Sequence, residues 1–189
     1  RQAKHPLDNL HFVHGEASAL ARSGALGEVD VVVGLHACGG LSDVIISHAV
    51  AQGAAFAVCT CCFLSNRRLR VPGSGSGGRP DLQRDEWLLA GSRSSDTPPD
   101  GTGGGKKGAL LDEVLRSAEL QHDPRTAALG AHTLNAMRAA AAEHYAKGDL
   151  QVDVVSFEPK YSPRNFIVVG RRGVLPKQVE EPSRTEQGD

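Results

Sequence analysis

The sequence has no long apolar run, no excess of charge of either sign and no internal repeat. Its apolar stretches fall well short of the roughly 20 residues that a membrane-spanning helix needs, so we expect no membrane partner. With 21 Lys and Arg against 22 Asp and Glu, the net charge is −1, and no overall field draws the chain onto nucleic acid. No secretory signal peptide is recognisable at its start. The remaining composition, 40 % hydrophobic and 23 % charged over 189 residues, is that of one ordinary globular domain.

Cysteine is scarce as well, and its spacing excludes a secreted disulfide framework. The four cysteines fall in two clusters, Cys38 by itself and then Cys59, Cys61 and Cys62 close together. Such clustering is not typical of the disulfide scaffolds of small extracellular domains. We therefore expect a reducing, cytoplasmic setting in which the thiols are free.

The apolar segments predict an α/β fold. Residues 29–35 and 54–59 are short apolar runs without alternation, typical of strands that are buried on both faces between helices. A helix should connect them, with Ser42 as its N-cap and Gly53 just past its C-terminus. Because strand, helix and strand follow within about thirty residues, we expect the two strands to pair in parallel.

Further elements flank this unit. In chain order they are a strand over 10–13, a helix over 17–22, helices over 109–120 and 127–147, and strands over 152–157 and 165–170. The segment between the last two strands is too short for a crossover helix, so they should pair antiparallel. We therefore predict a mostly parallel sheet that ends in an antiparallel hairpin.

Two segments have the composition of disordered chain. Residues 71–106 are rich in Gly, Ser and Pro, and residues 173–189 are polar, so neither can bury enough apolar surface to offset the entropy of ordering. Within the first segment, residues 85–90 carry the only tryptophan and predict a short anchored helix. The folded part should thus be a partial domain over 1–172, interrupted by this insertion.

The residues suited to chemistry gather at the ends of two predicted strands. One strand runs into His36–Gly40 and the other into Cys59–Cys62. Both loops should emerge at one edge of the sheet, because parallel strands joined by a crossover lie side by side, and open α/β sheets bind ligands at that edge. Gly39 and Gly40 would let a ligand approach the backbone closely.

Three interpretations of these loops stay open. They could form the floor of a cofactor or substrate pocket, with His36 as polar anchor or base and with a nucleophilic thiol as a special case. The cysteines and a histidine could instead bind zinc, but Cys-x-Cys-Cys is not the usual ligand spacing, so we expect no metal. Finally, the cysteines could be small buried hydrophobes at the strand ends.

These motifs resemble a known family. Leu35–Gly39, Ser42-Asp43 and the Cys-x-Cys-Cys-Phe strand end are similar to the methyltransferase domain of the glutathione S-transferase C-terminal domain-containing protein family. More distant tRNA ribose methyltransferases share this style of loop. The sequence departs from the family at Thr60, where the family has proline, and at Leu41-Ser42, where it has Ala-Thr. The likeness also includes Leu129-Gly130, Arg138-Ala139, Val154–Pro159 and Ser162–Asn165.

The resemblance implies a Rossmann-like, S-adenosylmethionine-dependent methyltransferase, represented by the C-terminal part of its sheet. No G-x-G turn follows a predicted strand, so the turn that binds most of the donor is expected upstream of Arg1. Without the earlier strands, the sheet should expose an unpaired edge and an uncovered face, which favours aggregation. The methyl acceptor is unknown, with RNA weakly favoured. The alternative is a catalytically inactive scaffold or interaction domain of the same fold.

The resemblance also implies site residues. The catalytic positions would be His36, Cys61 and Cys62, with His36 as the candidate base. Glu16 falls where this fold often places an acid near the adenine, although it could equally be a surface glutamate that opens a helix. The implied donor-binding positions are Glu16, Ala17, His36, Ala37, Cys38 and Gly39.

Other charged residues have plainer interpretations. We interpret Asp43 as a charge that favours a helix N-terminus and Arg164 as a solvated hairpin arginine, rather than as reacting groups. The basic cluster Arg67, Arg68 and Arg70 is expected to be a solvated surface, with RNA contact as its alternative.

Overall fold

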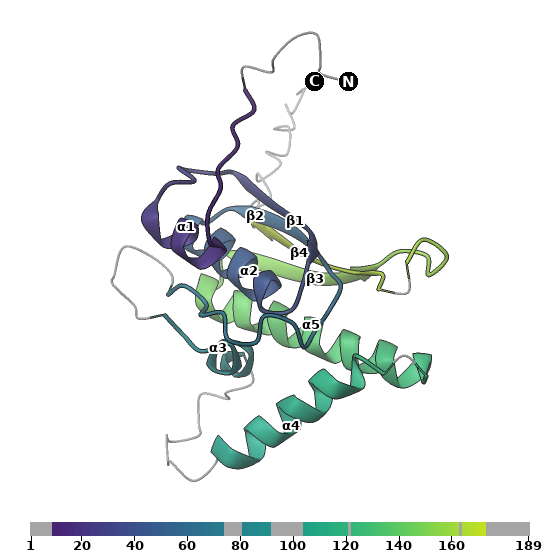
Figure 1. Cartoon of the computed structure of the whole chain (residues 1–189). Helices are drawn as coiled ribbons and strands as arrows, with labels where there is room; N and C mark the ends of the chain where they lie inside the picture. Colours follow the sequence, from purple (N-terminus) through teal and green to yellow (C-terminus); the bar gives the residue numbers. More distant parts are fainter. Residues whose placement is uncertain (1–8, 74–80, 92–103, 121, 163, 173–189) are drawn as a thin grey trace, which may run out of the picture.

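The computed structural model describes residues 9–73, 81–91, 104–120, 122–162 and 164–172, with the backbone alone for 104–107. Helices and strands follow one another along the chain in the arrangement of Figure 1. The elements are α1 (Ala17–Ser23), β1 (Val31–Ala37), α2 (Gly40–Gln52), β2 (Ala55–Thr60), α3 (Arg84–Ala90), α4 (Gly104–Ser117), α5 (Pro124–Ala146), β3 (Leu150–Ser156) and β4 (Phe166–Arg172).

The four strands form one sheet in the order β1-β2-β4-β3. β1 and β2, which α2 connects along the chain, pair in parallel, and β3 and β4 pair antiparallel, as the sequence predicts. β4 also pairs antiparallel with β2, because it enters the sheet between β2 and β3. Two of the three strand pairs are therefore antiparallel, because β4 alone runs opposite to β1, β2 and β3. The predicted antiparallel hairpin at the end of the sheet is present, whereas β1 and β2 form the one parallel pair among the described strands. The general α/β class is confirmed.

Helices cover one face of this sheet. α2 packs on β1 and β2, α5 packs on β3 and β4, and no other described helix contacts a strand. On the other face, Val31, Val33 and Leu35 of β1 are 58 %, 64 % and 77 % exposed. The prediction that this strand is buried on both faces is therefore wrong, because within the described residues only one face has a covering layer.

The predicted first strand is also absent. Residues 10–13 form no strand, and Phe12 is 89 % exposed. A strand needs a neighbour for its backbone groups, and β1, the adjacent edge of the sheet, pairs only with β2 in the part of the chain described. Residues 10–13 are mostly apolar, but among the described strands they have no neighbour with which to pair.

The predicted helix between β1 and β2 exists, but its first turn differs. Gly39 occupies the N-cap, and the Ser42 hydroxyl lies inside the first turn, where it donates to the carbonyl of Ala37. Ser42 is therefore not the N-cap. Gly53 ends the helix in the left-handed conformation, as predicted, with φ of 62°.

α3 confirms the anchored segment around the tryptophan. A bridge between Val71 and Leu82 leads into this helix, and Trp87 is 1 % exposed and stacks on Tyr145 of α5 with ring centroids 4.8 Å apart. The predicted insertion and tail lie mostly outside the described residues, at 74–80, 92–103 and 173–189. None of the described helices is both long enough and apolar enough to cross a bilayer.

Candidate functional site

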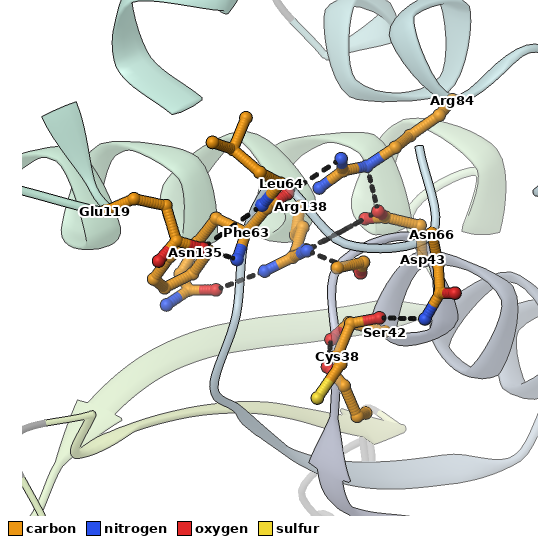
Figure 2. Close-up of polar contacts among 12 residues, drawn as sticks. Cys38, Ser42, Asp43, Phe63, Leu64, Asn66, Arg84, Glu119, Asn135 and Arg138 are labelled. Atoms are coloured by element: carbon orange, nitrogen blue, oxygen red, sulfur yellow. Dashed lines mark hydrogen bonds and ion pairs between the residues drawn. The ribbon is translucent and has the colours of Figure 1, made fainter. Parts of the chain in front are cut away.

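The loops after β1 and β2 lie against each other, as predicted from the parallel pairing. The Gly39 amide donates to the Cys62 carbonyl at 2.5 Å, and the Gly40 amide donates to the Ser65 carbonyl at 3.1 Å. The side-chain amide of Asn66 donates to the Cys38 carbonyl at 3.0 Å (Figure 2). The two loops are thus tied by bonds that involve no sulfur atom.

Gly39 and Gly40, in the first loop, lack side chains where the second loop packs against them. Gly39 has φ of 55° and ψ of −123°, a conformation open to glycine, and a Cβ there would overlap the Ser65 carbonyl. A Cβ on Gly40 would overlap the Asn66 carbonyl in the same way. The absence of a side chain at these two positions therefore serves the contact with the second loop, and approach of a ligand to their backbone stays a prediction.

His36 lies at an irregularity near the end of β1. The pairing register with β2 shifts between Gly34 and Ala37, and His36 within this bulge has φ of 53° and an exposed side chain. Bulges redirect side chains, and left-handed residues other than glycine are uncommon. The bulge thus turns the imidazole outward at the edge of the sheet where the two loops meet.

Three thiols come together between the loops. The Sγ atoms of Cys38, Cys61 and Cys62 all lie within 4.8 Å of one another, and those of Cys38 and Cys61 are 2.8 Å apart. Burial, followed by the hydrogen bond with Cys38, raises the pKa of Cys61 to about 12. At neutral pH this thiol is protonated, so its surroundings do not favour it as a free nucleophile.

A buried ionic cluster supports both loops from the helical side (Figure 2). Asp43 of α2 is fully buried and accepts from Arg84 Nε at 2.7 Å and from Arg138 Nε at 2.8 Å. Arg138 also donates to the Gly39 carbonyl at 3.0 Å, and Arg84 donates to the Phe63 carbonyl at 2.9 Å. Asp43 is therefore the centre of a clamp rather than only a charge at a helix start.

A further polar chain reaches the end of β2. Arg138 Nη1 donates to Asn135 Oδ1 at 2.9 Å, and Asn135 Nδ2 donates to Thr60 Oγ1 at 3.1 Å. Thr60 stands where the resembling family has proline, and its hydroxyl gives this strand end a hydrogen bond that proline lacks. The departure thus adds a side-chain link to α5.

Arg164 forms a second clamp. Its guanidinium donates to the Cys61 carbonyl at 2.7 Å and pairs with Glu119 at 2.6 Å. Glu119 accepts from the amides of Phe63 and Leu64 at 2.5 and 3.2 Å. Burial raises the pKa of Glu119, but these amides and Arg164 outweigh it and hold the pKa below its usual value. Our interpretation of Arg164 as a solvated arginine is wrong.

Phe63 lies between the two clamps. Its ring is 1 % exposed, with the Arg138 guanidinium 5.8 Å and the Arg164 guanidinium 5.4 Å from the ring centroid. Both distances fall within the range of cation–π attraction. The aromatic residue after the cysteines therefore joins the two clamps into one support.

The two implied donor positions on α1 do not join this site. Glu16 caps α1 by accepting from the amides of Ser18 and Ala19, and these bonds lower its pKa. Ala17 is the first residue of α1, which packs on α2 and contacts no described strand. The interpretation of Glu16 as the opening of a helix is confirmed, and its contact with a donor stays a prediction.

One cavity borders the second clamp. It has a volume of about 360 Å³ and lies against Arg164, Phe166 and the start of α5. Two others, of about 280 and 460 Å³, lie near Gly53 and Arg172. None of these three cavities is lined by Glu16, Ala17 or His36–Gly39.

Sequence reasoning missed the importance of Arg84, which follows a low-complexity segment. Arg138 was noted only as part of the family likeness, yet an arginine among the alanines of the helix predicted over 127–147 could have suggested a buried partner. Within the basic cluster, Arg67 pairs with Asp112 on the surface. RNA contact there stays a prediction.

The chain is similar to a curated protein. The chain is 28 % identical to the mouse (Mus musculus) glutathione S-transferase C-terminal domain-containing protein over 171 residues, which cover 87 % of this chain. The chain spans 22 % of the length of that relative. No protein-family model matches the chain, and no solved structure does.

Proposed function

We propose that the chain forms part of an S-adenosylmethionine-dependent methyltransferase domain, with an unknown acceptor for which RNA is the favoured class. The observation that carries the proposal is the bulge at the end of β1, where His36 is left-handed and exposed beside the joined loops. Backbone irregularities of this kind concentrate at functional sites. The resemblance of the same loops to a methyltransferase domain supplies the reaction class.

None of the three cavities among the described residues is lined by the implied donor positions Glu16, Ala17 or His36–Gly39. Ser65 and Asn66 occupy the space beside Gly39 and Gly40, and Glu16 is engaged as a helix cap. We therefore assign to this chain only the exposed histidine and the support of the loops. Methyl transfer depends chiefly on holding two reactants in line, and the two arginine clamps give the rigid frame that this requires.

His36 would act as a general base when the acceptor must lose a proton. Histidine is the side chain that enzymes use most often for proton transfer, and the bulge exposes His36 at the edge where open α/β sheets bind ligands. An acceptor nitrogen or hydroxyl of RNA fits this requirement, because such groups carry a proton that leaves on methylation. The histidine is thus the residue whose removal should separate binding from turnover.

Calorimetric titration of S-adenosylmethionine into the full-length natural protein tests the proposal. We expect binding, and we expect His36→Ala to lower methylation of an RNA acceptor by about 100-fold, the usual contribution of a general base. The exposed His144 at the end of α5 gives the matched control, and His144→Ala should leave both measurements unchanged. No heat from folded protein would reject the methyltransferase assignment.

A non-catalytic interaction domain is the second candidate, and the open face of the sheet favours it. Val31, Val33 and Leu35 present apolar surface at the edge strand, as a contact for another protein would. The same titration separates the two candidates. Folded protein that binds no donor, but whose open face is protected by a partner, would support the interaction domain.

A further inference from the structure

Three thiols converge from two neighbouring strand ends. Cys38 follows β1, whereas Cys61 and Cys62 follow β2, and their three Sγ atoms lie within 4.8 Å of one another. Zinc–sulfur bonds of about 2.3 Å in a tetrahedron place sulfur atoms about 3.8 Å apart. The three sulfur atoms are thus gathered near the separation that zinc needs, and Cys38 and Cys61, whose Sγ atoms are 2.8 Å apart, must move apart to admit the ion.

We propose that Cys38, Cys61 and Cys62 bind a zinc ion through three thiolates. Thiolates are soft ligands that select Zn²⁺ and Cu⁺ over the hard ions Mg²⁺ and Ca²⁺. No histidine or carboxylate among the described residues joins the group within the same distance. The fourth tetrahedral position stays open to water or a substrate atom, as in zinc sites that carry out chemistry.

The unusual spacing Cys-x-Cys-Cys describes the second loop alone. Cys-x-Cys-Cys alone offers adjacent cysteines that chelate poorly, but the parallel pairing of β1 and β2 adds Cys38 from the neighbouring strand. The backbone bond from Gly39 to Cys62 and the bond from the Asn66 side-chain amide to the Cys38 carbonyl fix the loops without using sulfur. The ligands are therefore held in place by contacts that zinc binding leaves intact.

The surrounding charges complement a zinc–thiolate centre. Three thiolates and Zn²⁺ together carry one negative charge. The supporting cluster contains the cations Arg84, Arg138 and Arg164 and the anions Asp43 and Glu119, so three positive and two negative charges leave one positive charge. Two of these arginines donate to carbonyls of the ligand loops, at Gly39 and Cys61. The supporting cluster thus places its excess positive charge beside the proposed zinc ligands.

This zinc site requires no methyl donor, so it goes beyond the proposed function and can fail separately from it. A protein that binds zinc but no S-adenosylmethionine would retain this inference and lose the methyltransferase assignment. The opposite result would lose the zinc site alone.

Cobalt titration of the full chain under reducing conditions tests the site, because Co²⁺ reports thiolate ligands spectroscopically. We expect one Co²⁺ per chain, an intense near-ultraviolet thiolate-to-cobalt band and the visible bands of tetrahedral Co²⁺, with displacement by one equivalent of Zn²⁺. Replacing Cys38, Cys61 or Cys62 with serine should weaken zinc binding at least about 100-fold, since even changes outside the ligand shell cost about 10- to 100-fold.

Cys59 gives the matched control, because it is half-buried in β2 and lies outside the thiol group. Cys59→Ser should leave the cobalt spectrum and zinc affinity unchanged. If a serine variant fails to fold, the intensity of the wild-type charge-transfer band still counts the thiolates, and a value below three overturns the site. The inference also fails if reduced protein binds no Co²⁺ or Zn²⁺, binds Cu⁺ only, or is isolated with a Cys38–Cys61 disulfide and binds no metal after reduction.

Discussion

Arg138 and Asp43 are 95 residues apart in the chain, yet the arginine Nε lies 2.8 Å from the aspartate Oδ1, with both side chains fully buried. Desolvating two such charges is costly, and the pair persists because each also bonds to other polar groups. Asp43 receives Arg84 as well, and Arg138 binds the Gly39 carbonyl. The pair therefore joins α2 and α5 to the loop after β1.

Removing one member of this pair should destabilise the fold strongly. We expect Arg138→Met to lower the free energy of unfolding by about 3–5 kcal/mol, because it leaves a buried carboxylate with one partner fewer. Urea unfolding measures the change. The exposed pair Arg67–Asp112 gives the control, and Arg67→Met should cost about 0–1 kcal/mol. Equal losses for the two variants would contradict the role of the buried pair.

Gly39→Ala should disturb the joined loops beyond the cost of its backbone conformation. Gly39 and Gly24 both have positive φ, but only at Gly39 would a Cβ overlap another residue, the Ser65 carbonyl. We expect Gly24→Ala to cost about 1–2 kcal/mol from its conformation alone and Gly39→Ala clearly more. Thermal unfolding of both variants tests this. A smaller loss at Gly39 would show that the second loop moves aside freely.

Acid should weaken the fold through His48 in α2. This side chain is 6 % exposed, and burial lowers its pKa below the ordinary value of 6.5. Below pH 6.5 the unfolded chain binds the proton more readily, so stability is complete above that pH and is lost as the pH falls through the folded-state pKa. Unfolding free energies between pH 7.5 and 5.5 should decline in the natural protein.

Histidine variants test whether His48 causes this decline of the unfolding free energy with falling pH. His48→Gln should flatten it, whereas replacement of the exposed His144 should not. A decline that is unchanged in His48→Gln would show that another group is responsible.

The open face of β1 should make this chain self-associate. Val33 and Leu35 are 64 % and 77 % exposed on a strand at the edge of the sheet, a surface on which other strands can pair and pack. We expect Val33→Lys with Leu35→Lys to raise the fraction of monomer in sedimentation velocity. Leu129→Lys is the control, since Leu129 is 67 % exposed on a helix. A monomeric natural chain would disprove the prediction.

The sequence correctly predicted the features that depend on residues close together in the chain. The apolar runs on either side of α2 identified the parallel pair, and the rule that parallel strands end at one edge brought Cys38 to Cys61 and Cys62. Gly53 was predicted because its position after an apolar helix demands a left-handed residue. Each of these inferences needs only local pattern and chain direction.

What the sequence could not predict depends on distant partners. A hairpin of β3 and β4 is compatible with either strand lying next to β2, so the position of β4 inside the sheet had no local signal. The partners of Asp43 are 41 and 95 residues away, and nothing in the sequence around Arg84 indicates burial. Likewise, the close contact between Gly39 and Ser65 became visible only in the folded structure.

The central place of β4 has a kinetic consequence. Phe56 of β2 pairs with Gly170 of β4, which is almost the last described residue. The pairing of β2 with β4 can therefore form only after nearly all of the described chain is available. Contacts of such long sequence separation are formed slowly, because the loop entropy is lost before the contact is gained. Arg164, which anchors the Cys61 loop, arrives with the same hairpin. During synthesis on the ribosome, the thiol loops should therefore take their final form only after the C-terminal hairpin has emerged.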